Sequence, residues 1–222
     1  MPSEKLNSTP ADPVAVPKAV VNRLSLYLRE LQHLRRDGKE TISSQSLGER
    51  LGFSDAQVRK DLAYFGHFGQ PGIGYRCQEL IEAIRKILGT SRSWSVAVVG
   101  IGNLGRALLG YKGFFDQGFN LVAAFDSDPP KIGTTVEGVL VRSMDELPER
   151  VQVDRIQLGM IAVPAVAAQP VADRLVAAGI RGIVNFAPVT LSLPEYVSLV
   201  GVDLAIELEQ IAFSVANRSR PR

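Results

Sequence analysis

The chain has 222 residues, of which 45% are hydrophobic, and its formal net charge is only +2, so it has room for one large domain or two small ones with real cores. No apolar run approaches the roughly 20 residues that cross a membrane, and the N-terminus lacks the apolar core of a signal peptide. The single cysteine, Cys77, excludes an intrachain disulfide, and we expect a cytoplasmic protein without a membrane partner.

Residues 1–16 hold three prolines and small polar residues without a period, which predicts a flexible arm. Residues 17–37 are predicted to form a long amphipathic helix, with Pro17 suited to its first turn and Gly38 to its end. Its apolar positions follow helical spacing: Val20, Leu24, Tyr27, Leu28, Leu31 and Leu34. Its outer face is basic and is expected to be solvated: Lys18, Arg23, Arg29, Arg35 and Arg36.

Residues 43–66 predict a helix, a short glycine-containing turn and a second helix. Ser43 or Ser44 can cap the first helix, and the segment 54–57 has the pattern of a capping box that opens the second. The apolar side chains of the second helix share one face: Val58, Leu62 and Phe65. The polar side chains lie elsewhere and can reach base edges and phosphates in a DNA major groove: Ser54, Gln57, Arg59, Lys60 and Tyr64.

Residues 66–76 carry four glycines, one proline and aromatic residues at intervals. A glycine-rich β-hairpin here would form the wing of a winged helix, able to lie along the DNA backbone or enter a minor groove. Candidate contacts in this wing are Gln70, Tyr75 and Arg76. A plain helical hairpin with a surface loop is the alternative. Residues 1–90 hold 13 basic and 10 acidic side chains, which permits DNA binding without implying it.

A last helical stripe closes the first domain, and Gly89 ends it: Leu80, Ile81, Ile84, Ile87 and Leu88. Cys77 precedes this stripe and has no histidine nearby, so it is interpreted as inert. Residues 90–93 are a short polar linker.

The second domain begins with the pattern of a dinucleotide-binding unit. An apolar strand, residues 96–99, leads through a glycine turn into a helix, and a second strand ends in Asp126. Gly100 permits the turn, Gly102 lets the backbone approach a pyrophosphate, and Gly105 lets helix and strand pack closely. Phosphates would lie at the helix N-terminus, where unpaired N–H groups favour an anion. The predicted cradle is Gly100, Ile101, Gly102, Asn103, Leu104 and Gly105.

Asp126 favours NAD(H), because a carboxylate there accepts hydrogen bonds from a ribose 2′-hydroxyl and repels a 2′-phosphate. An ordinary turn residue at the strand end is the alternative, since Asp128 and two prolines follow. The loop that continues to Gly138 contains Lys131 and is expected to border the adenosine half of the ligand.

Further strands alternate with helices, which predicts a parallel sheet. We expect strands at residues 139–141, 156–163 and 182–186, and helices at residues 144–151 and 165–178. Ligands bind beyond the carboxyl ends of such strands. The nicotinamide ring is therefore expected beside Val163, Pro164, Asn185, Phe186 and Ala187. For each of these, a loop residue that merely ends a strand is the alternative.

Residues 203–215 form a last helical pattern, with Asp203 placed as its cap. Its apolar stripe consists of Leu204, Leu208, Ile211 and Val215. A stripe this apolar must be buried, either against its own sheet or against a partner subunit.

Catalysis is not expected. A dehydrogenase needs a group near the nicotinamide that takes or gives a proton, and both histidines, His33 and His67, lie in the first domain. Tyr111 is the candidate nearest the expected ligand, and the sequence holds no Tyr-x-x-x-Lys pair, metal cluster or serine elbow. Binding without turnover is the better interpretation, and an NAD-dependent oxidoreductase with a helical substrate domain is the alternative.

Several segments together resemble the family of redox-sensing transcriptional repressors called Rex. They are residues 57–66, 72–75, 99–105, 125–129, 185–188 and 202–205. The resemblance runs from about Pro17 to the end of the chain. It implies an α/β protein with a winged helix-turn-helix domain, a Rossmann-type parallel-sheet domain and a C-terminal dimerisation helix. The expected bounds are 17–90, 91–200 and 201–222.

The resemblance further implies a homodimer that binds an inverted-repeat operator in double-stranded DNA and exchanges its C-terminal helices. NADH would close the dimer and release DNA. A pocket closed by Leu204, Ile206 and Phe186 would hold the neutral reduced nicotinamide at a lower desolvation cost than the cationic oxidised ring. Tyr111 and Asp203 would adjust this balance. A regulator that senses another nucleotide, such as coenzyme A, is a third interpretation.

Overall fold

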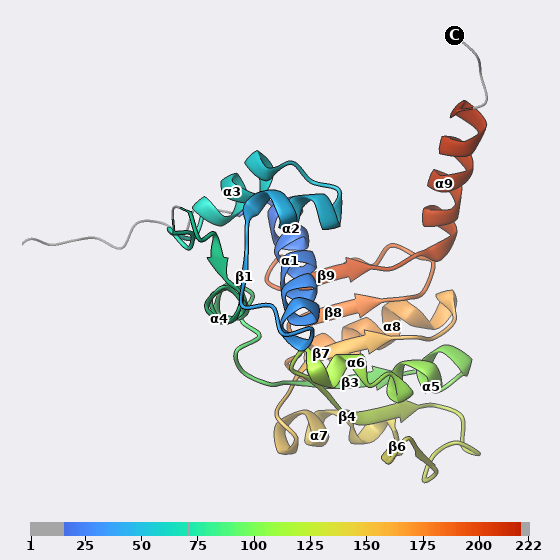
Figure 1. Ribbon diagram of the computed structural model, residues 1–222. Helices are drawn as coiled ribbons and strands as arrows, with labels where there is room; N and C mark the ends of the chain where they lie inside the picture. Colours follow the sequence, from blue (N-terminus) through green and yellow to red (C-terminus); the bar gives the residue numbers. More distant parts are fainter. Residues whose placement is uncertain (1–15, 71, 219–222) are drawn as a thin grey trace, which may run out of the picture. The chain divides into compact units, whose positions relative to one another are not determined.

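The computed structural model describes residues 16–70 and 72–218, which divide into two compact units, one up to Ser91 and one from Arg92 onward (Figure 1). Each unit has its own hydrophobic core. The predicted arm lies outside the described residues, apart from Val16. Within the described chain, no helix is both long and apolar enough to cross a membrane.

In its described residues, the first unit contains helices α1 to α4 and a small antiparallel sheet of β1 and β2. The bounds are α1 Lys18–Arg36, β1 Thr41–Ile42, α2 Ser44–Leu51, α3 Asp55–Ala63, β2 Tyr75–Arg76 and α4 Cys77–Ile87. All six apolar positions predicted for the first helix are buried. The stripe of α4 packs into the same core, and Gly89 follows it in the left-handed region at φ +70°.

The short helices α2 and α3 begin at serine caps, as predicted. The Ser43 hydroxyl accepts a hydrogen bond from the backbone N–H of Ser46 at 3.0 Å, and the Ser54 hydroxyl accepts one from the N–H of Gln57 at 3.1 Å. The predicted capping box is only half formed, because the Gln57 side chain donates to Asp61 instead of returning to the helix start. The two helices form the expected helix-turn-helix pair.

The predicted wing is only a minimal hairpin, in which Gln70 and Gly74 exchange two backbone hydrogen bonds at 2.8 and 2.9 Å. A single isolated bridge joins Gln70 to Gly74, and β2 pairs with β1, which precedes α2. Gly74 lies so close to the chain that a Cβ there would stand 2.5 Å from the carbonyl oxygen of Ile42. The segment is therefore held against the core, and Tyr75 points inward with 7% of its surface exposed.

The second unit is built on a seven-stranded sheet in the order β5-β6-β4-β3-β7-β8-β9, in which every pairing is parallel except that of β5 with β6. The bounds are β3 Trp94–Val99, β4 Phe119–Asp126, β5 Thr135–Val136, β6 Val139–Ser143, β7 Ile156–Ile161, β8 Gly182–Asn185 and β9 Ser198–Gly201. Without β5, this is the strand order of a Rossmann-type sheet. The strand order changes direction between β3 and β7, where such sheets bind their ligands.

Helices cover both faces of this sheet (Figure 1). Their bounds are α5 Asn103–Gly110, α6 Gly113–Asp116, α7 Leu147–Val153 after the 3₁₀ turn Met144–Glu146, and α8 Ala165–Ala177. Side chains of α7 and α8 pack into the core on one face, and those of α5 and α6 pack on the other. The predicted α/β fold is confirmed, although β5, α6 and β9 were not expected from the sequence.

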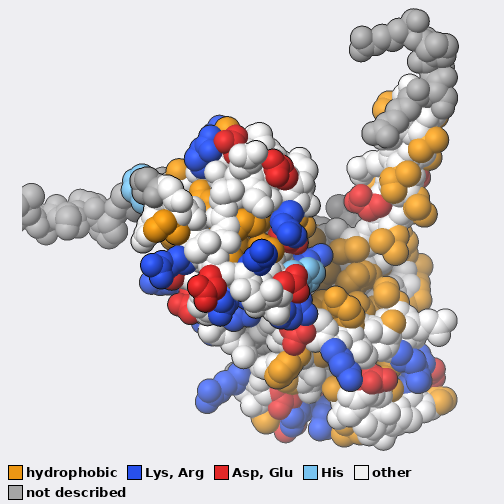
Figure 2. All heavy atoms as spheres, in the orientation of Figure 1, with side chains coloured by type: hydrophobic (Ala, Val, Ile, Leu, Met, Phe, Trp, Pro, Cys, Tyr) orange, Lys and Arg blue, Asp and Glu red, His pale blue; other side chains and the backbone are white. Residues whose placement is uncertain are grey.

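Helix α9, Leu204–Arg218, projects from the end of the sheet (Figure 1). Its predicted apolar stripe is 60–71% exposed: Leu204, Leu208, Ile211 and Val215. Figure 2 shows hydrophobic side chains exposed along this helix. Burial of this stripe against its own sheet is therefore excluded within one chain.

Candidate nucleotide-binding and DNA-binding sites

The glycine turn after β3 has the geometry of a phosphate cradle. Gly100 has a φ of +93°, and a Cβ there would lie 2.5 Å from the carbonyl oxygen of Ala162. A Cβ on Gly105 would overlap the carbonyl oxygen of Gly100, whereas a Cβ on Gly102 would meet no atom within 4 Å. The turn thus needs a glycine at position 100, and the close packing needs one at position 105. Gly102 leaves open space in front of α5.

The start of α5 presents backbone donors to that open space. Gly102 is the N-cap residue, and no side chain caps the helix. The first N–H groups of a helix have no partner within it, so they suit an anionic ligand. Asn103 and Leu104 are exposed there. Ile101 is different, because its side chain is buried and its N–H donates to Asp126 at 2.7 Å.

Asp126 ends β4 and is 8% exposed. Its carboxylate accepts hydrogen bonds from the N–H of Ile101, from the N–H of Asp128 at 2.9 Å and from Nζ of Lys131 at 3.1 Å. Burial raises the pKa of the Asp126 carboxyl, but these hydrogen bonds outweigh burial and leave the pKa below its ordinary value. A carboxylate has about four acceptor positions. Asp126 is thus ionised and retains about one position for a ligand hydroxyl.

These residues line a cavity of about 380 Å³ at the carboxyl ends of β3, β4 and β7. Six predicted residues meet in it: Gly100, Gly102, Asp126, Lys131, Val163 and Pro164. Other lining residues were missed: Ser127, Asp128, Met144, Ala162, Ala167 and Val171. Ser127 and Ala162 directly follow strand ends, so the rule for parallel sheets would have found them. The helix residues among them depend on tertiary packing and left no local signal.

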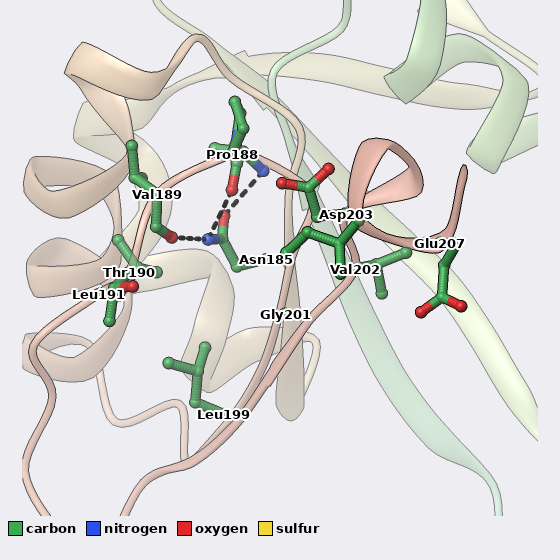
Figure 3. Close-up of a pocket in the computed structure, with 12 residues that line it drawn as sticks. Asn185, Pro188, Val189, Thr190, Leu191, Leu199, Gly201, Val202, Asp203 and Glu207 are labelled. Atoms are coloured by element: carbon green, nitrogen blue, oxygen red, sulfur yellow. Dashed lines mark hydrogen bonds between the residues drawn. The ribbon is translucent and has the colours of Figure 1, made fainter. Parts of the chain in front are cut away.

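A second cavity, of about 470 Å³, lies at the carboxyl ends of β8 and β9 beside the start of α9 (Figure 3). Asn185 and Ala187 line it, together with Asp203, Ile206 and Glu207.

Asn185 is 2% exposed in this cavity wall. Its Nδ2 donates to the carbonyl oxygens of Ala187 at 3.0 Å and Val189 at 2.9 Å, and its Oδ1 accepts from the N–H of Ala187 at 3.0 Å (Figure 3). Both amide hydrogens are therefore used within the loop. This side chain therefore shapes the loop, and it lines the cavity without a free amide hydrogen to donate to a ligand.

The residues predicted to close the nicotinamide pocket do not lie together within one chain. Phe186 packs with the core on the α5 face and lines neither of these two cavities. Ile206 lines the second cavity, and Leu204 is exposed to solvent. Tyr111, at the end of α5, is exposed and packs edge-on against Phe114 with 4.9 Å between ring centres. The single chain does not assemble the closed pocket expected from the sequence.

Asp203 caps α9, as predicted. Its Oδ1 accepts a hydrogen bond from the N–H of Ala205 at 2.9 Å.

The exposed face of α3 carries the cationic and aromatic side chains predicted to meet DNA. Lys60 and Tyr64 are exposed, and so is Arg59, which donates to Asp55 at 2.6 Å and to the Ser44 hydroxyl at 3.2 Å. Gln70 and Arg76 are also exposed.

Two predicted DNA contacts are constrained by other roles. Tyr75 is buried in the core of the first unit, because β2 docks there, so its side chain is not offered to DNA. The Ser54 hydroxyl is engaged as the cap of α3.

Two smaller expectations concern isolated residues. Cys77 is fully buried, and burial raises the pKa of its thiol, in keeping with an inert residue. Arg23, expected on a solvated face, instead forms an ion pair with the buried Asp61. Within the described residues, no group of three His, Cys, Asp or Glu side chains has the arrangement of a metal site.

Two protein-family models match the chain. The model described as a CoA binding domain matches residues 91–189. The model described as a putative DNA-binding protein N-terminus matches residues 15–63. The two matches fall on the second and the first unit, respectively.

The chain is also similar, over most of its length, to proteins named redox-sensing transcriptional repressor Rex. The protein from Desulfitobacterium hafniense is 51% identical over 203 residues, which cover 91% of this chain and 97% of that protein. The protein from Carboxydothermus hydrogenoformans is 47% identical and covers 90% of this chain and 96% of its own length.

Solved structures of RSP, a Rex-family repressor, have the same fold. RSP in complex with β-NAD⁺ and operator DNA matches with a TM-score of 0.86 and 37% identity, covering 91% of this chain and 94% of that one. RSP in complex with β-NADH matches with a TM-score of 0.82 and 35% identity, covering 92% and 96%.

Proposed function

Since the chain belongs to the Rex family of redox-sensing transcriptional repressors, we propose that its two units divide one regulatory task between them. The chain is a DNA-binding repressor that senses NADH. The second unit would hold NAD(H) in the cavity between the glycine turn and Asp126, and the first would place α3 on operator DNA.

The geometry of Gly102 is the observation that supports the nucleotide site. The space in front of this residue is open, lies at the uncapped start of α5 and leads into the cavity that ends at Asp126. A pyrophosphate fits the backbone donors, and a ribose hydroxyl fits the remaining acceptor position of the carboxylate. A phosphate on that ribose would face the Asp126 charge, although Lys131 offsets part of it. NADPH and coenzyme A are therefore weaker candidates.

Side chains on α3 and the adjacent loop support the DNA-binding role; all of them are exposed except Gln57, which is partly buried. Arg59, Lys60 and Arg76 supply cations that suit phosphates, and Gln57, Tyr64 and Gln70 are neutral side chains with hydrogen-bonding groups. We retain the predicted contacts except Tyr75, which is buried.

The exposed stripe of α9 supports a homodimer with exchanged C-terminal helices. An apolar hollow of about 360 Å³ opens on the sheet of the same unit, and it is lined by side chains from β3, β7, β8 and β9. Stripe and hollow are both apolar surfaces that gain by leaving water. Two chains can cover both surfaces, and an inverted-repeat operator has matching two-fold symmetry.

The switch follows from linkage between the two sites. If NADH favours a dimer geometry that DNA disfavours, DNA must weaken NADH binding by the same factor. Apolar side chains at the start of α9, Leu204 and Ile206, would lower the cost of burying a neutral reduced ring relative to a cationic oxidised one. No bond of the nucleotide needs to break. Tyr111 is exposed and both histidines lie in the first unit, which supports binding without turnover.

A calorimetric titration tests this proposal. NADH, NAD⁺, NADPH and coenzyme A are titrated into the protein with and without an inverted-repeat duplex. We expect NADH to bind most tightly and to lose affinity when the duplex is present. Gly102→Ala should lower NADH affinity by about tenfold or more without changing the melting temperature, because the added methyl group occupies only ligand space. Tight binding of coenzyme A, or NADH binding indifferent to the duplex, would contradict the proposal.

Two variants test the finer points. Leu204→Asp should weaken NADH more than NAD⁺, and equal weakening would exclude the apolar-pocket explanation. If the protein consumed NADH in the presence of small carbonyl compounds, and Tyr111→Phe abolished this consumption, the chain would be an oxidoreductase instead.

A further inference from the structure

Helix α3 carries a charged residue on its buried face. Asp61 has 0% of its surface exposed and lies between the core residues Val58 and Leu62. An unpaired charge in such a place is very costly, so a buried carboxylate needs partners that use its acceptor positions.

Four donor groups surround this carboxylate. Arg23 on α1 donates through Nε to Oδ2 at 2.6 Å and through Nη2 to Oδ1 at 2.7 Å. The Tyr27 hydroxyl, also on α1, donates to Oδ2 at 2.8 Å, and Nε2 of Gln57 donates to Oδ1 at 2.8 Å. All four acceptor positions of the carboxylate are thereby used. Burial raises the pKa of Asp61, but the hydrogen bonds outweigh it and hold the pKa below its ordinary value.

The carboxylate fixes which way the Gln57 amide points. An ionised carboxylate only accepts hydrogen bonds, so the amide must turn its NH₂ group, and not its oxygen, toward Asp61. Gln57 is only partly buried and lies in the first full turn of α3. Its second N–H and its Oε1 are thus left in a fixed order. One donor beside one acceptor is the arrangement with which glutamine binds N7 and N6 of adenine in the major groove.

We propose that Asp61 is a positioning residue for operator recognition, which holds the Gln57 amide so that it reads one adenine in each half-site. The proposal rests on the assignment of α3 as the recognition helix. Arg23 and Tyr27 hold the carboxylate from α1, so the amide is anchored to the core of the unit and not only to its own helix. Arg59 is outside this network and pairs with Asp55.

The test compares base preferences and not only affinities. Duplexes bound by the full-length dimer are selected from a random-sequence library, and the preference at each position is then measured with single base-pair substitutions. Gln57→Met should remove the preference at one A·T pair per half-site, by about tenfold. Asp61→Asn should remove the preference at that same pair and leave the other pairs and the NADH affinity unchanged. The double variant should be no worse there than Gln57→Met alone.

A merely structural role predicts something different. If Asp61→Asn lowers affinity equally for all substituted duplexes, or leaves the Gln57-dependent preference intact, the positioning role is overturned. Leu24→Val is the matched control, because it weakens the same core without touching the network.

Failure of a variant to fold and a wrong assignment of α3 can each be told apart from failure of the positioning role. If Asp61→Asn does not fold, a triple variant takes its place: Arg23→Met, Tyr27→Phe and Asp61→Leu. It replaces the network by apolar residues of comparable volume, and such replacements of buried ion pairs are often neutral for stability. It should show the same single-position loss, and retained preference at that position would overturn the proposal. If the unmodified protein selects no sequence, the assignment of α3 itself is wrong.

Discussion

The two units differ in how completely their apolar surface and buried polar groups are covered within one chain. In the first unit every predicted core position of α1 is buried, and the buried charge Asp61 has all of its acceptor positions used. In the second unit the stripe of α9 is largely exposed, and an apolar hollow is left on the sheet. Among the described residues, the first unit thus buries its predicted core by itself, whereas the second unit leaves apolar surface on α9 and on the sheet uncovered.

In the homodimer that we propose, this difference indicates where nucleotide binding and dimer geometry are coupled. A unit whose core is fully packed is not expected to repack when a nucleotide binds in the other unit. The unsatisfied surfaces begin next to the second cavity, where Asp203 and Ile206 contribute both to the wall and to the start of α9. In the proposed homodimer, a change of nucleotide beside this wall would alter the position of α9, and through it the spacing of the two copies of the first unit.

The largest effect is expected from the uncovered helix. Changing Leu208→Asp together with Ile211→Asp places two charges in the stripe, which cannot then be buried at low cost. We expect a monomer in sedimentation experiments and a loss of operator affinity on the order of a hundredfold, because two linked half-site contacts become independent. Glu209→Gln, on the same helix, should leave both measurements unchanged. A dimer that survives the double change would show that the interface lies elsewhere.

The next effect concerns the glycine turn. Gly105→Ala forces a methyl group into the carbonyl oxygen of Gly100, and overpacking of this kind costs about 1–3 kcal/mol. The fluorescence of Trp94, the only tryptophan, reports on the second unit. The melting temperature of the second unit, measured by this fluorescence, should fall. The first unit, whose helices contribute only part of the helical signal, should melt at an unchanged temperature. Gly102→Ala is the control, since its methyl group has room in the free protein.

The sequence predicted those elements whose stability is local. Ser43 and Ser54 as caps, the glycine turn and the apolar periods of α1 and α4 each follow from residues within one or two turns of each other. The parallel sheet followed from the alternation of strands and helices. The bridge β1–β2 was missed, because its strands are short and far apart in sequence. The hairpin of β5 and β6 turns at Glu137–Gly138, both at positive φ, and a glutamate gives no signal for such a turn.

Parts of the site were predictable for the same reason. Six residues of the first cavity follow from the glycine turn, the acidic strand end and the ends of parallel strands. The use of both Asn185 amide hydrogens within its own loop was not predicted, because nothing in the sequence indicates it. Asp61 was missed although it had a signal: it is three residues after Val58 and precedes Leu62, which places it on the apolar face of its helix.

A moderate effect is expected at the ribose end of the cavity. Asp126→Asn removes the charge that opposes a 2′-phosphate, while Lys131 remains. NADH affinity should fall, and the preference for NADH over NADPH should shrink by about tenfold, as the loss of one charged hydrogen bond predicts. Lys131→Ala should widen that preference, because the carboxylate then acts without its neutralising partner. Lys39→Ala, in the first unit, controls for the loss of a positive charge. An unchanged ratio in both variants would exclude this pair as the determinant.

The smallest effect is a pH dependence in the first unit. The folded state holds the pKa of Asp61 below its ordinary value of 3.8, so the ionised network stabilises the fold fully above that value. This stabilisation is lost as the pH falls through the lower, folded pKa. Asp61→Asn should therefore melt at a lower temperature than the unmodified protein near neutral pH, and the difference should shrink below pH 3.8. Asp37→Asn, exposed at the end of α1, is the control. The melting is followed by the helical signal in circular dichroism, and a difference independent of pH would show that Asp61 contributes through its shape and not its charge.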